Sequence, residues 1–322
     1  MSATAICVGS SRLIYIRAGS GRLYWADALT STINALNFAT AESSPDHLLD
    51  CKFMGDTLLL FGAETVEFWP ASKLDPALPF VPLVGRVFPV GIRATGCATL
   101  FASTFAWITN RNQVCVGNPD TVISNSGLEE RLRASTTASL FKMRIEGDDF
   151  LVVRLDTSTW VFSTRSSQWS TFESYSLTNW IPQCSTGTYL GSGVDGNVIQ
   201  FSNDHQDFGG VLERRFRAGA PLNGDNLQVN NVMLRTNPGQ TPFIVPTYDN
   251  PTVEMRASGD GGFTWSKWRE KSLGKQGVYR MDMRWRSLGL FGSPGFLAAF
   301  RVTDPVPFRV SEVLINEGYP GP

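Results

Sequence analysis

Short apolar runs separated by polar turns recur along the chain up to about residue 210. The clearest units are SRLIYIRAGSGRLYWAD, CKFMGDTLLLFGAETVEFWPAS, CATLFASTFAWITNRNQVCVGNP, FKMRIEGDDFLVVRLDTSTWVFSTRSSQWSTFES and TGTYLGSGVDGNVIQFSND. Strands separated by such turns are typical of a sandwich, barrel or propeller, and a unit of roughly 35–45 residues with up to four strands favours propeller blades. The pattern predicts a β-propeller-like domain at residues 1–210 with five or so blades. A further blade, or a closure that uses the chain termini, would complete the ring.

The pattern changes near residue 210, where a basic cluster and a loop rich in Pro, Gly and Asn precede longer, alternating strands. In YRMDMRW the apolar side chains fall on one face of the expected strand and are Tyr279, Met281, Met283 and Trp285. Such alternation is typical of a half-buried antiparallel strand. The fold class predicted is therefore all-β, a β-propeller-like domain followed by a β-sandwich-like or barrel-like C-terminal domain at residues 211–322.

Helix signals are scarce. In SNSGLEERLRASTTASLF, Ser126 is expected to be the N-cap and Glu129 to complete a capping box, which predicts a short helix over Leu128–Arg133. A weaker signal for one or two helical turns opens ADALTSTINALNFATAES.

Composition narrows the classes of function. The 322 residues carry a net charge of −1 and only 18% of them are charged, so nothing draws the chain strongly to nucleic acid or to an anionic membrane. No apolar run is long enough to span a bilayer. The N-terminal stretch MSATAICVGSSRLIY lacks the basic region of a signal peptide. We therefore expect no membrane anchor and no secretion by that route.

The cysteines are expected to be free, buried thiols in a reducing compartment. They lie at long spacings without a C-x-x-C motif, which argues against structural zinc, and are Cys7, Cys51, Cys97, Cys115 and Cys184. The two histidines, His47 and His205, are expected in exposed loops. No cofactor or metal site is predicted.

Two carboxylate pairs and a basic cluster are further candidates for chemistry. Asp148–Asp149 is more simply a turn, because neighbours on a strand point to opposite faces. Glu129–Glu130 more simply marks the start of a helix. The cluster in ERRFR could contact phosphates, but salt bridges or protection of a strand edge are the simpler interpretation; its arginines are Arg214, Arg215 and Arg217. Hydrolase, phosphate-loop and zinc-protease motifs do not occur, so no catalytic residue is predicted.

The octet SGDGGFTW matches S-x-D-x-G-x-T-W and resembles the Asp-box of sialidase-type propellers. Its residue types predict a stabilised turn, followed by a strand that starts at Thr264 and Trp265. The residues expected to build the turn are Ser258, Asp260, Gly262, Thr264 and Trp265. A retaining sialidase would also need an arginine cluster, a Tyr nucleophile and a Glu beside it. The arginine motif is not found, and the octet occurs once.

The proline-rich stretch LDPALPFVPLVGRVFP, residues 74–89, is expected to contact a partner. It carries three apolar side chains that are expected to be exposed, in a segment that cannot form a regular strand ladder; these are Phe80, Val81 and Phe88. A buried connector between blades is an equally good interpretation.

From about residue 50 onward, the order of features resembles one family. The stretch GAETVEFWPAS follows the apolar strand LLLF, and SGDGGFTWSKW is followed by LGKQGVYRMDMRWRSLG and FRVTDPVPFRVSEVLIN. This is similar to the tail hub or nozzle proteins of short-tailed (podovirus-type) bacteriophages, also called packaged-DNA stabilisation proteins, although the chain looks short for them.

The resemblance implies a structural, non-enzymatic protein of the virion tail, assembled in the host bacterial cytoplasm. Such proteins form a six-fold ring below the portal and its adaptor. The ring extends the channel through which double-stranded DNA passes, carries appendages such as a tail needle, fibre or tailspike, and retains the genome until ejection.

Two other functions stay open on the residues alone. One is a propeller glycan hydrolase, which would lose activity on Asp260→Asn. The other is a monomeric carbohydrate-binding tail protein that uses surface tryptophans such as Trp265 and Trp268. Oligomeric state separates both from a ring.

Overall fold

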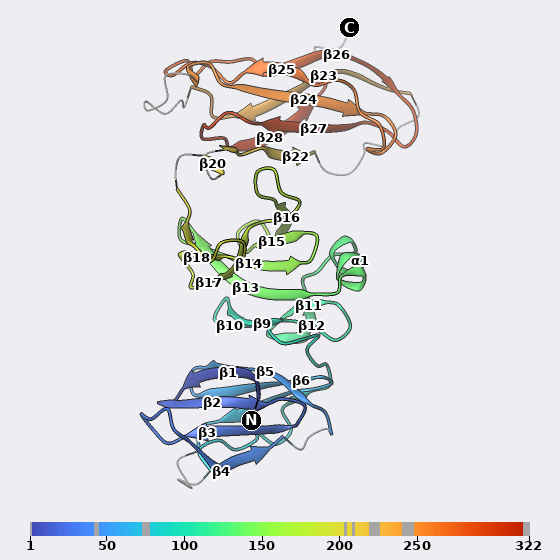
Figure 1. Cartoon of the computed structure of the whole chain (residues 1–322). Helices are drawn as coiled ribbons and strands as arrows, with labels where there is room; N and C mark the ends of the chain where they lie inside the picture. Colours follow the sequence, from blue (N-terminus) through green and yellow to red (C-terminus); the bar gives the residue numbers. More distant parts are fainter. Residues whose placement is uncertain are drawn as a thin grey trace. The chain divides into compact units, whose positions relative to one another are not determined.

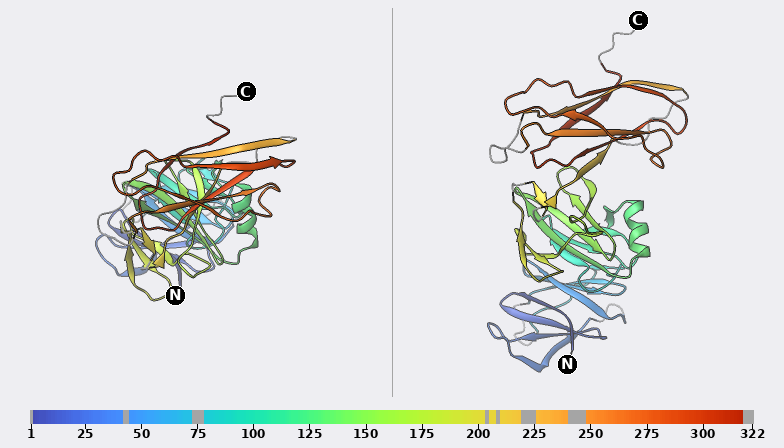
Figure 2. Two further views of the ribbon diagram at one scale, coloured as in Figure 1. Left: turned by 90° about the horizontal axis from the view of Figure 1, so that it is seen from above. Right: turned by 45° about the horizontal axis from the view of Figure 1, so that its top comes forward.

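The structure, a computed structural model, describes residues 2–41, 45–72, 78–202, 205–207, 210–218, 226–239 and 248–317. The described chain is nearly all β, with one α-helix, so the all-β prediction is confirmed (Figure 1). It divides into two compact units, Met1–Phe201 and Ser202–Pro322, and further views are given in Figure 2.

The first unit is a succession of antiparallel sheets, each made of strands that are consecutive in the chain. We call these five sheets of the described chain blades 1 to 5. Blade 1 is β1 (Ala3–Gly9), β2 (Arg12–Arg17), β3 (Arg22–Ala26) and β4 (Ile33–Thr40); blade 2 is β5 (Leu48–Met54), β6 (Thr57–Gly62), β7 (Val66–Pro70) and β8 (Val87–Phe88); blade 3 is β9 (Ala98–Phe101), β10 (Thr104–Ile108), β11 (Val114–Val116) and β12 (Asn118–Val122); blade 4 is β13 (Ala138–Ile145), β14 (Asp148–Leu155), β15 (Thr159–Ser163) and β16 (Gln168–Phe172); blade 5 is β17 (Pro182–Ser185), β18 (Tyr189–Ser192) and β19 (Val198–Gln200).

Blade 2 explains why some strands are apolar at every position. Along β6, Leu58 and Leu60 belong to a core cluster shared with blade 1, and Leu59 and Phe61 belong to a cluster shared with blades 3 and 4. Successive side chains point to opposite faces of a strand, so both faces of blade 2 are covered by neighbouring blades. The first strand of each blade packs on the first strand of the next, from β1 through β5, β9 and β13 to β17.

Helix α1 (Ser126–Ala134) starts earlier and ends later than the predicted Leu128–Arg133. Its N-cap is Asn125, whose Oδ1 accepts a hydrogen bond from Leu128 N at 2.9 Å, so the expectation of Ser126 was wrong. The expected capping box is also replaced, because Glu129 Oε1 accepts from Ser124 Oγ at 2.9 Å. The helix is anchored by two buried leucines, Leu128 and Leu132.

Two local predictions in the first unit were wrong. The weak helical signal opens at Ala26, which is the last residue of β3, and residues 27–32 form a turn and irregular chain before β4 instead of a helix. Asp148 and Asp149 start β14 rather than form the turn, which is Glu146–Gly147 with positive φ at both residues. The two aspartates instead bind arginines, at 2.9 Å to Arg165 and 2.8 Å to Arg144.

The second unit packs two antiparallel sheets around one core cluster. One sheet has the order β22-β27-β24-β25 and the other β26-β23-β28, and a short hairpin of β20 and β21 precedes them. The strands are β20 (Gln206–Asp207), β21 (Gly210–Val211), β22 (Arg214–Arg217), β23 (Leu227–Thr236), β24 (Thr252–Ser258), β25 (Arg269–Ser272), β26 (Arg284–Phe291), β27 (Leu297–Val302) and β28 (Val310–Ile315).

The alternation predicted for YRMDMRW holds only at its end. Met283 and Trp285 are buried, but Tyr279 is 68% exposed and the strand starts only at Arg284. Trp285 is held in place because its Nε1 donates to Arg269 O at 2.7 Å. The four side chains therefore do not share one buried face.

Candidate functional site

The octet forms a closed hydrogen-bonded turn between β24 and β25. Asp260 accepts from Ser258 Oγ at 2.7 Å and, through its two oxygens, from Thr264 N at 2.9 Å and Thr264 Oγ1 at 2.6 Å. Ser258 Oγ in turn accepts from Gly262 N at 2.9 Å, and Trp265 Nε1 donates to Gly262 O at 2.9 Å. Gly262 has φ of 100°, a conformation that favours glycine.

These contacts determine what Asp260 can do chemically. Hydrogen bonds from the Thr264 side chain, the Thr264 backbone and the Ser258 side chain hold the pKa of Asp260 well below its ordinary value. A general acid must hold a proton near neutral pH, so this carboxylate is unsuited to that role. Its geometry is that of a structural turn.

The strand expected after the turn starts later. Thr264 and Trp265 lie outside regular structure and β25 begins at Arg269, so the prediction of a strand start at Thr264 was wrong. The physical reason is that Thr264 N is bound to Asp260, and Trp265 turns back to bond Gly262 O. Ser266 N still donates to Ala257 O of β24 at 2.8 Å, but regular pairing of β25 with β24 begins only at Arg269.

Beside this turn, arginines and tryptophans alternate over the sheet β22-β27-β24-β25. Trp265 has the guanidinium carbons of Arg217 and Arg256 at 5.4 and 4.5 Å from its ring centroid. Trp268 has those of Arg256 and Arg301 at 4.4 and 4.3 Å. We call these five residues the arginine–tryptophan ladder. Because two cations lie over each indole, the rings are already engaged as cation–π partners.

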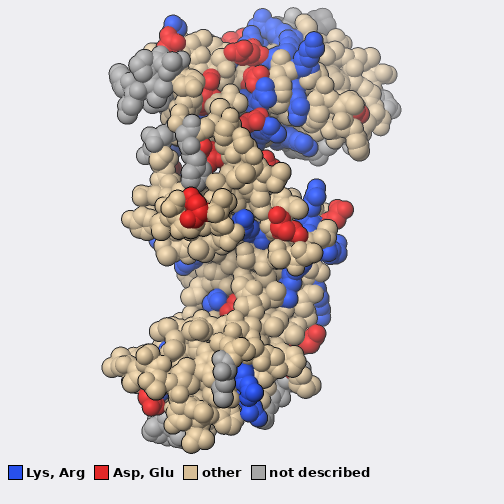
Figure 3. Space-filling view, in the orientation of Figure 1, with Lys and Arg blue, Asp and Glu red and all other residues tan. Residues whose placement is uncertain are grey.

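The ladder continues into ion pairs on the same sheet. Arg301 forms a bidentate pair with Glu254 and lies 3.6 Å from Glu213, which also pairs with Arg215 at 2.5 Å. The pKa of Arg256 is lowered, first by burial and then by the positive charges of Arg215, Arg217 and Arg301. In the second unit, Figure 3 shows Lys and Arg side chains gathered next to acidic ones.

The three arginines of the basic cluster ERRFR bind different partners in the structure. Arg214 donates to Val306 O and Asp304 O at 2.6 Å each, Arg215 pairs with Glu213, and Arg217 lies over Trp265. The sequence did not single out Arg256 or Arg301. Each of them alternates with apolar residues along its strand, and this alternation could have indicated that both side chains lie on the polar face. Which arginines are neighbours on that face depends on the cross-strand register as well.

The proline-rich segment differs from the expectation of three exposed apolar side chains. Residues 73–77 lie outside the described part of the chain. Phe80 is 3% exposed and packs on Phe53, with ring centroids 5.5 Å apart. Phe88 is half-buried in β8, which pairs with β7, and its ring lies 5.0 Å from that of Phe68. Both expectations of exposure were wrong, because blades 1 to 3 cover these rings; Val81 is 42% exposed.

Within the described residues, the cysteines and histidines do not form a metal-binding site. Cys51, Cys97 and Cys115 are buried, Cys7 is half-buried and Cys184 is exposed. Burial raises the pKa of Cys97 to about 12 and that of Cys115 to about 11. Within the same described ranges, no group of His, Cys, Asp and Glu could hold a metal ion. No helix there is long and apolar enough to cross a membrane.

Asp260→Asn is expected to lower the Tm of the second unit by about 5 °C or more at pH 7, because charge-assisted hydrogen bonds are lost. The folded pKa of Asp260 is depressed, so its stabilisation is complete above the unfolded pKa of about 4 and is lost as pH falls through the folded value. The gap between wild type and variant should therefore shrink in acid, measured by thermal unfolding from pH 7 to pH 2. Asp249→Asn, at an exposed ion pair with Lys275, is the matched control. Equal melting of wild type and Asp260→Asn at pH 7 would contradict the assignment.

Two family models match this chain in succession. Bacteriophage P22 Gp10, beta-propeller, matches residues 4–180, and Bacteriophage P22 Gp10, beta-sandwich, matches residues 215–317. The first match covers more than half of the chain, and the chain belongs to the bacteriophage P22 Gp10 family. The predicted order of a propeller-like and a sandwich-like domain is confirmed, as is the resemblance to the phage tail hub and nozzle proteins.

A curated relative is the tail hub protein gp10 of Salmonella phage P22. It is 27% identical over 145 residues, which are 40% of this chain and 30% of the relative. The match therefore spans less than a third of that relative's length.

Solved structures give only weak likenesses. An exo-β-1,3-galactanase from Phanerochaete chrysosporium has a TM-score of 0.31 at 10% identity, with 97% of this chain and 95% of that chain covered. Kluyveromyces lactis Hsv2 has a TM-score of 0.31 at 10% identity, over 52% and 60%. YCF48 from Cyanidioschyzon merolae has a TM-score of 0.33 at 12% identity, over 92% and 94%. At these scores the likenesses carry no argument about function.

Proposed function

We propose that this protein is a structural component of a bacteriophage tail hub. The observation that carries the proposal is that both domains of the P22 Gp10 family follow each other in one chain. In this role, six copies form a ring below the portal adaptor. The ring extends the DNA channel, retains the packaged genome and serves in its ejection.

The partners follow from that position in the virion tail. They are other copies of the chain, the tail adaptor, and a tail needle, fibre or tailspike. Double-stranded DNA passes through transiently, and assembly takes place in the host cytoplasm. The net charge of −1 supports this role, because each phosphate that a protein neutralises adds salt-dependent affinity that would hold the DNA.

A structural role agrees better with the site than glycan chemistry does. The oxygens of Asp260 are occupied by Ser258 and Thr264, and its pKa is lowered. The indoles of Trp265 and Trp268 are covered by arginines instead of being free for sugar rings. No observation in the described residues favours the hydrolase or the monomeric sugar-binding protein.

The segment after residue 77 is our candidate contact with a tail partner. Although Phe80 and Phe88 are covered, four other apolar side chains of this segment are between 42% and 94% exposed; they are Leu78, Val81, Leu83 and Val84. Exposed apolar patches are typical of sites of protein association.

The first test is the mass and shape of the purified protein by light scattering and negative-stain imaging, with and without a tail extract. We expect a ring with a central hole, alone or on tails. A 35.4 kDa monomer that never joins a tail would overturn the proposal. The same imaging with Val81→Ser and Val84→Ser together tests the contact segment, which is contradicted if these variants join tails as wild type does.

A further inference from the structure

Two cysteines of different blades are neighbours in the interior of the first unit. Cys7 lies on β1 of blade 1, and Cys51 lies on β5 of blade 2. Cys51 is fully buried in the cluster that these blades share, and the half-buried Cys7 packs against the same cluster. The thiol of Cys51 is hydrogen-bonded to the thiol of Cys7. Both are free thiols in the structure.

The backbones of β1 and β5 lie close together at this place (Figure 1). Their Cα atoms approach within 8 Å, whereas sheets stacked face to face are ordinarily about 10 Å apart. Two residues further along both strands, a Cβ added to Gly9 would lie 2.2 Å from Cγ of Phe53. Side chains two residues apart point to the same face of a strand, so Cys7 and Cys51 belong to the same close approach.

Strand β1 can move the short distance that a disulfide requires. The Cα atoms of a disulfide are usually about 4.4–6.8 Å apart. In its sheet β1 is an edge strand that pairs with β2 alone. On the face that points away from Cys7, Ile6 is 60% exposed and Val8 is 71% exposed. A small shift of β1 toward β5 therefore breaks little packing among the described residues.

The other cysteines are not paired in this way. Cys97 and Cys115 share another cluster, but each of their thiols donates to a carbonyl. Cys97 Sγ donates to Ala138 O at 3.2 Å, and Cys115 Sγ donates to Pro119 O at 3.4 Å. Cys184 is exposed on β17. Burial in a common cluster does not by itself pair two thiols in this unit, so the contact between Cys7 and Cys51 is specific.

We propose that Cys7 and Cys51 form a disulfide between blades 1 and 2 once the chain leaves a reducing compartment. Thiols stay reduced in the cytosol, whereas disulfides form and persist outside it. The inference rests on the proposed function, in which the chain is assembled in the host cytoplasm and then released in the virion tail. The disulfide encloses β2, β3 and β4 in one covalent loop and ties blade 1 to blade 2.

The oxidant is a small soluble disulfide, and the reaction has two steps. The half-buried thiol of Cys7 loses its proton and attacks one sulfur of the oxidant, which releases one thiolate and leaves a mixed disulfide on Cys7. Cys51 then loses its proton and attacks the Cys7 sulfur, which releases the second thiolate. Two protein thiols are oxidised to one disulfide, and the small disulfide is reduced to two thiols.

The rate of closure should depend on pH. The hydrogen bond with Cys7, followed by burial, raises the pKa of the Cys51 thiol well above its ordinary value. The thiolate is the attacking form, so closure should accelerate as pH rises, by up to about tenfold per pH unit below that pKa.

Oxidation of the purified full-length protein tests the proposal. The protein carries Cys184→Ser, which removes the exposed thiol, and is incubated with 2-hydroxyethyl disulfide at about pH 8.5. Peptide mapping by mass spectrometry should find Cys7 joined to Cys51 in most molecules, while Cys97 and Cys115 still react with an alkylating reagent after denaturation. The Tm of the first unit should rise by about 5 °C or more, and a reductant should reverse the rise.

The matched control is Cys7→Ser in the same protein, with Cys7→Ala in its place if circular dichroism shows that the serine variant does not fold. It should show neither the cross-link nor the rise in Tm. The proposal is overturned if Cys51 still reacts with the alkylating reagent after prolonged oxidation, or if Cys7 keeps the small disulfide as a mixed product. A cross-linked protein that never joins tails would leave this inference standing and reject the hub role, and a protein that joins tails without cross-linking would reject the inference alone.

Discussion

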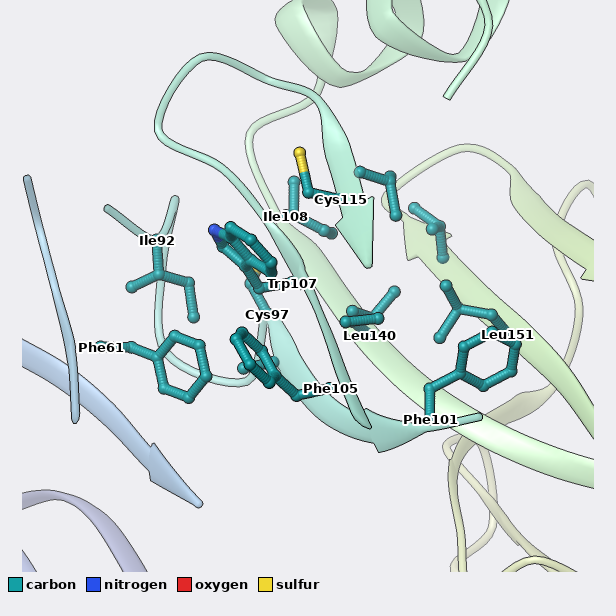
Figure 4. Packing of buried hydrophobic residues seen from close by; sticks show 14 of the residues in the cluster. Phe61, Ile92, Cys97, Phe101, Phe105, Trp107, Ile108, Cys115, Leu140 and Leu151 are labelled. Carbon is teal, nitrogen blue, oxygen red and sulfur yellow. The ribbon is translucent and has the colours of Figure 1, made fainter. Parts of the chain in front are cut away.

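Trp107→Ala is expected to lower the free energy of unfolding of the first unit by about 4 kcal/mol. Trp107 is fully buried and lies next to Phe105 (Figure 4), with ring centroids 5.1 Å apart. Its ring centroid also lies 6.3 Å from that of Phe88. Its cluster joins blades 2, 3 and 4, so the cavity would weaken the packing of three sheets together. Urea unfolding followed by tryptophan fluorescence and circular dichroism measures the loss.

A companion variant isolates the packing contribution. The Nε1 hydrogen of Trp107 has no partner among the described residues, so Trp107→Phe gives up no hydrogen bond and leaves a smaller cavity. We expect it to cost about 1–2 kcal/mol. If Trp107→Ala costs less than Trp107→Phe, the ring is not the packing centre that the structure shows.

Gly91→Ala is expected to destabilise the first unit by about 3 kcal/mol. An added Cβ would overlap the backbone of Ala63 and Glu64. These atoms cannot move freely, because Ile92 N donates to Gly62 O at 2.9 Å and Asn110 Nδ2 donates to Ala63 O at 3.0 Å. The backbones of blade 2 and of the segment entering blade 3 therefore cross at a separation that only glycine allows.

Gly127→Ala is the matched control in the same unit. Gly127 lies in the first turn of α1, where an added Cβ would find ordinary contacts, the nearest at 3.5 Å to Asn125 Oδ1. Alanine favours helix over glycine by up to about 1 kcal/mol, so this variant should be as stable as wild type or more so. Equal unfolding midpoints for Gly91→Ala and Gly127→Ala would refute the close approach.

Several features could be predicted from the sequence because they depend on neighbours along the chain. Alternating apolar runs and polar turns specify strands and hairpins, and these are the antiparallel meanders of blades 1 to 5. The octet supplies its own donors and acceptors between Ser258 and Trp265. The helix could be predicted in place and type, although its cap lay at Asn125, one residue before the expected Ser126.

The candidate surfaces could not be predicted in the same way. Phe80 and Phe88 stand in a proline-rich segment that resembles an exposed loop, yet one ring packs on Phe53 and the other on Phe68. The arginine–tryptophan ladder needs Arg217, Arg256 and Arg301 on one face, which depends on the pairing of β27 with both β22 and β24.

By itself, the sequence determined that this chain is an all-β protein of propeller-like and sandwich-like parts, with a turn closed around Asp260. Those properties come from period-two patterning and from hydrogen bonds over a few residues. Only the tertiary structure decided which apolar faces are covered and which stay open, as for Leu58 and Val8. Burial depends on which sheet lies opposite, and that partner is distant in the chain.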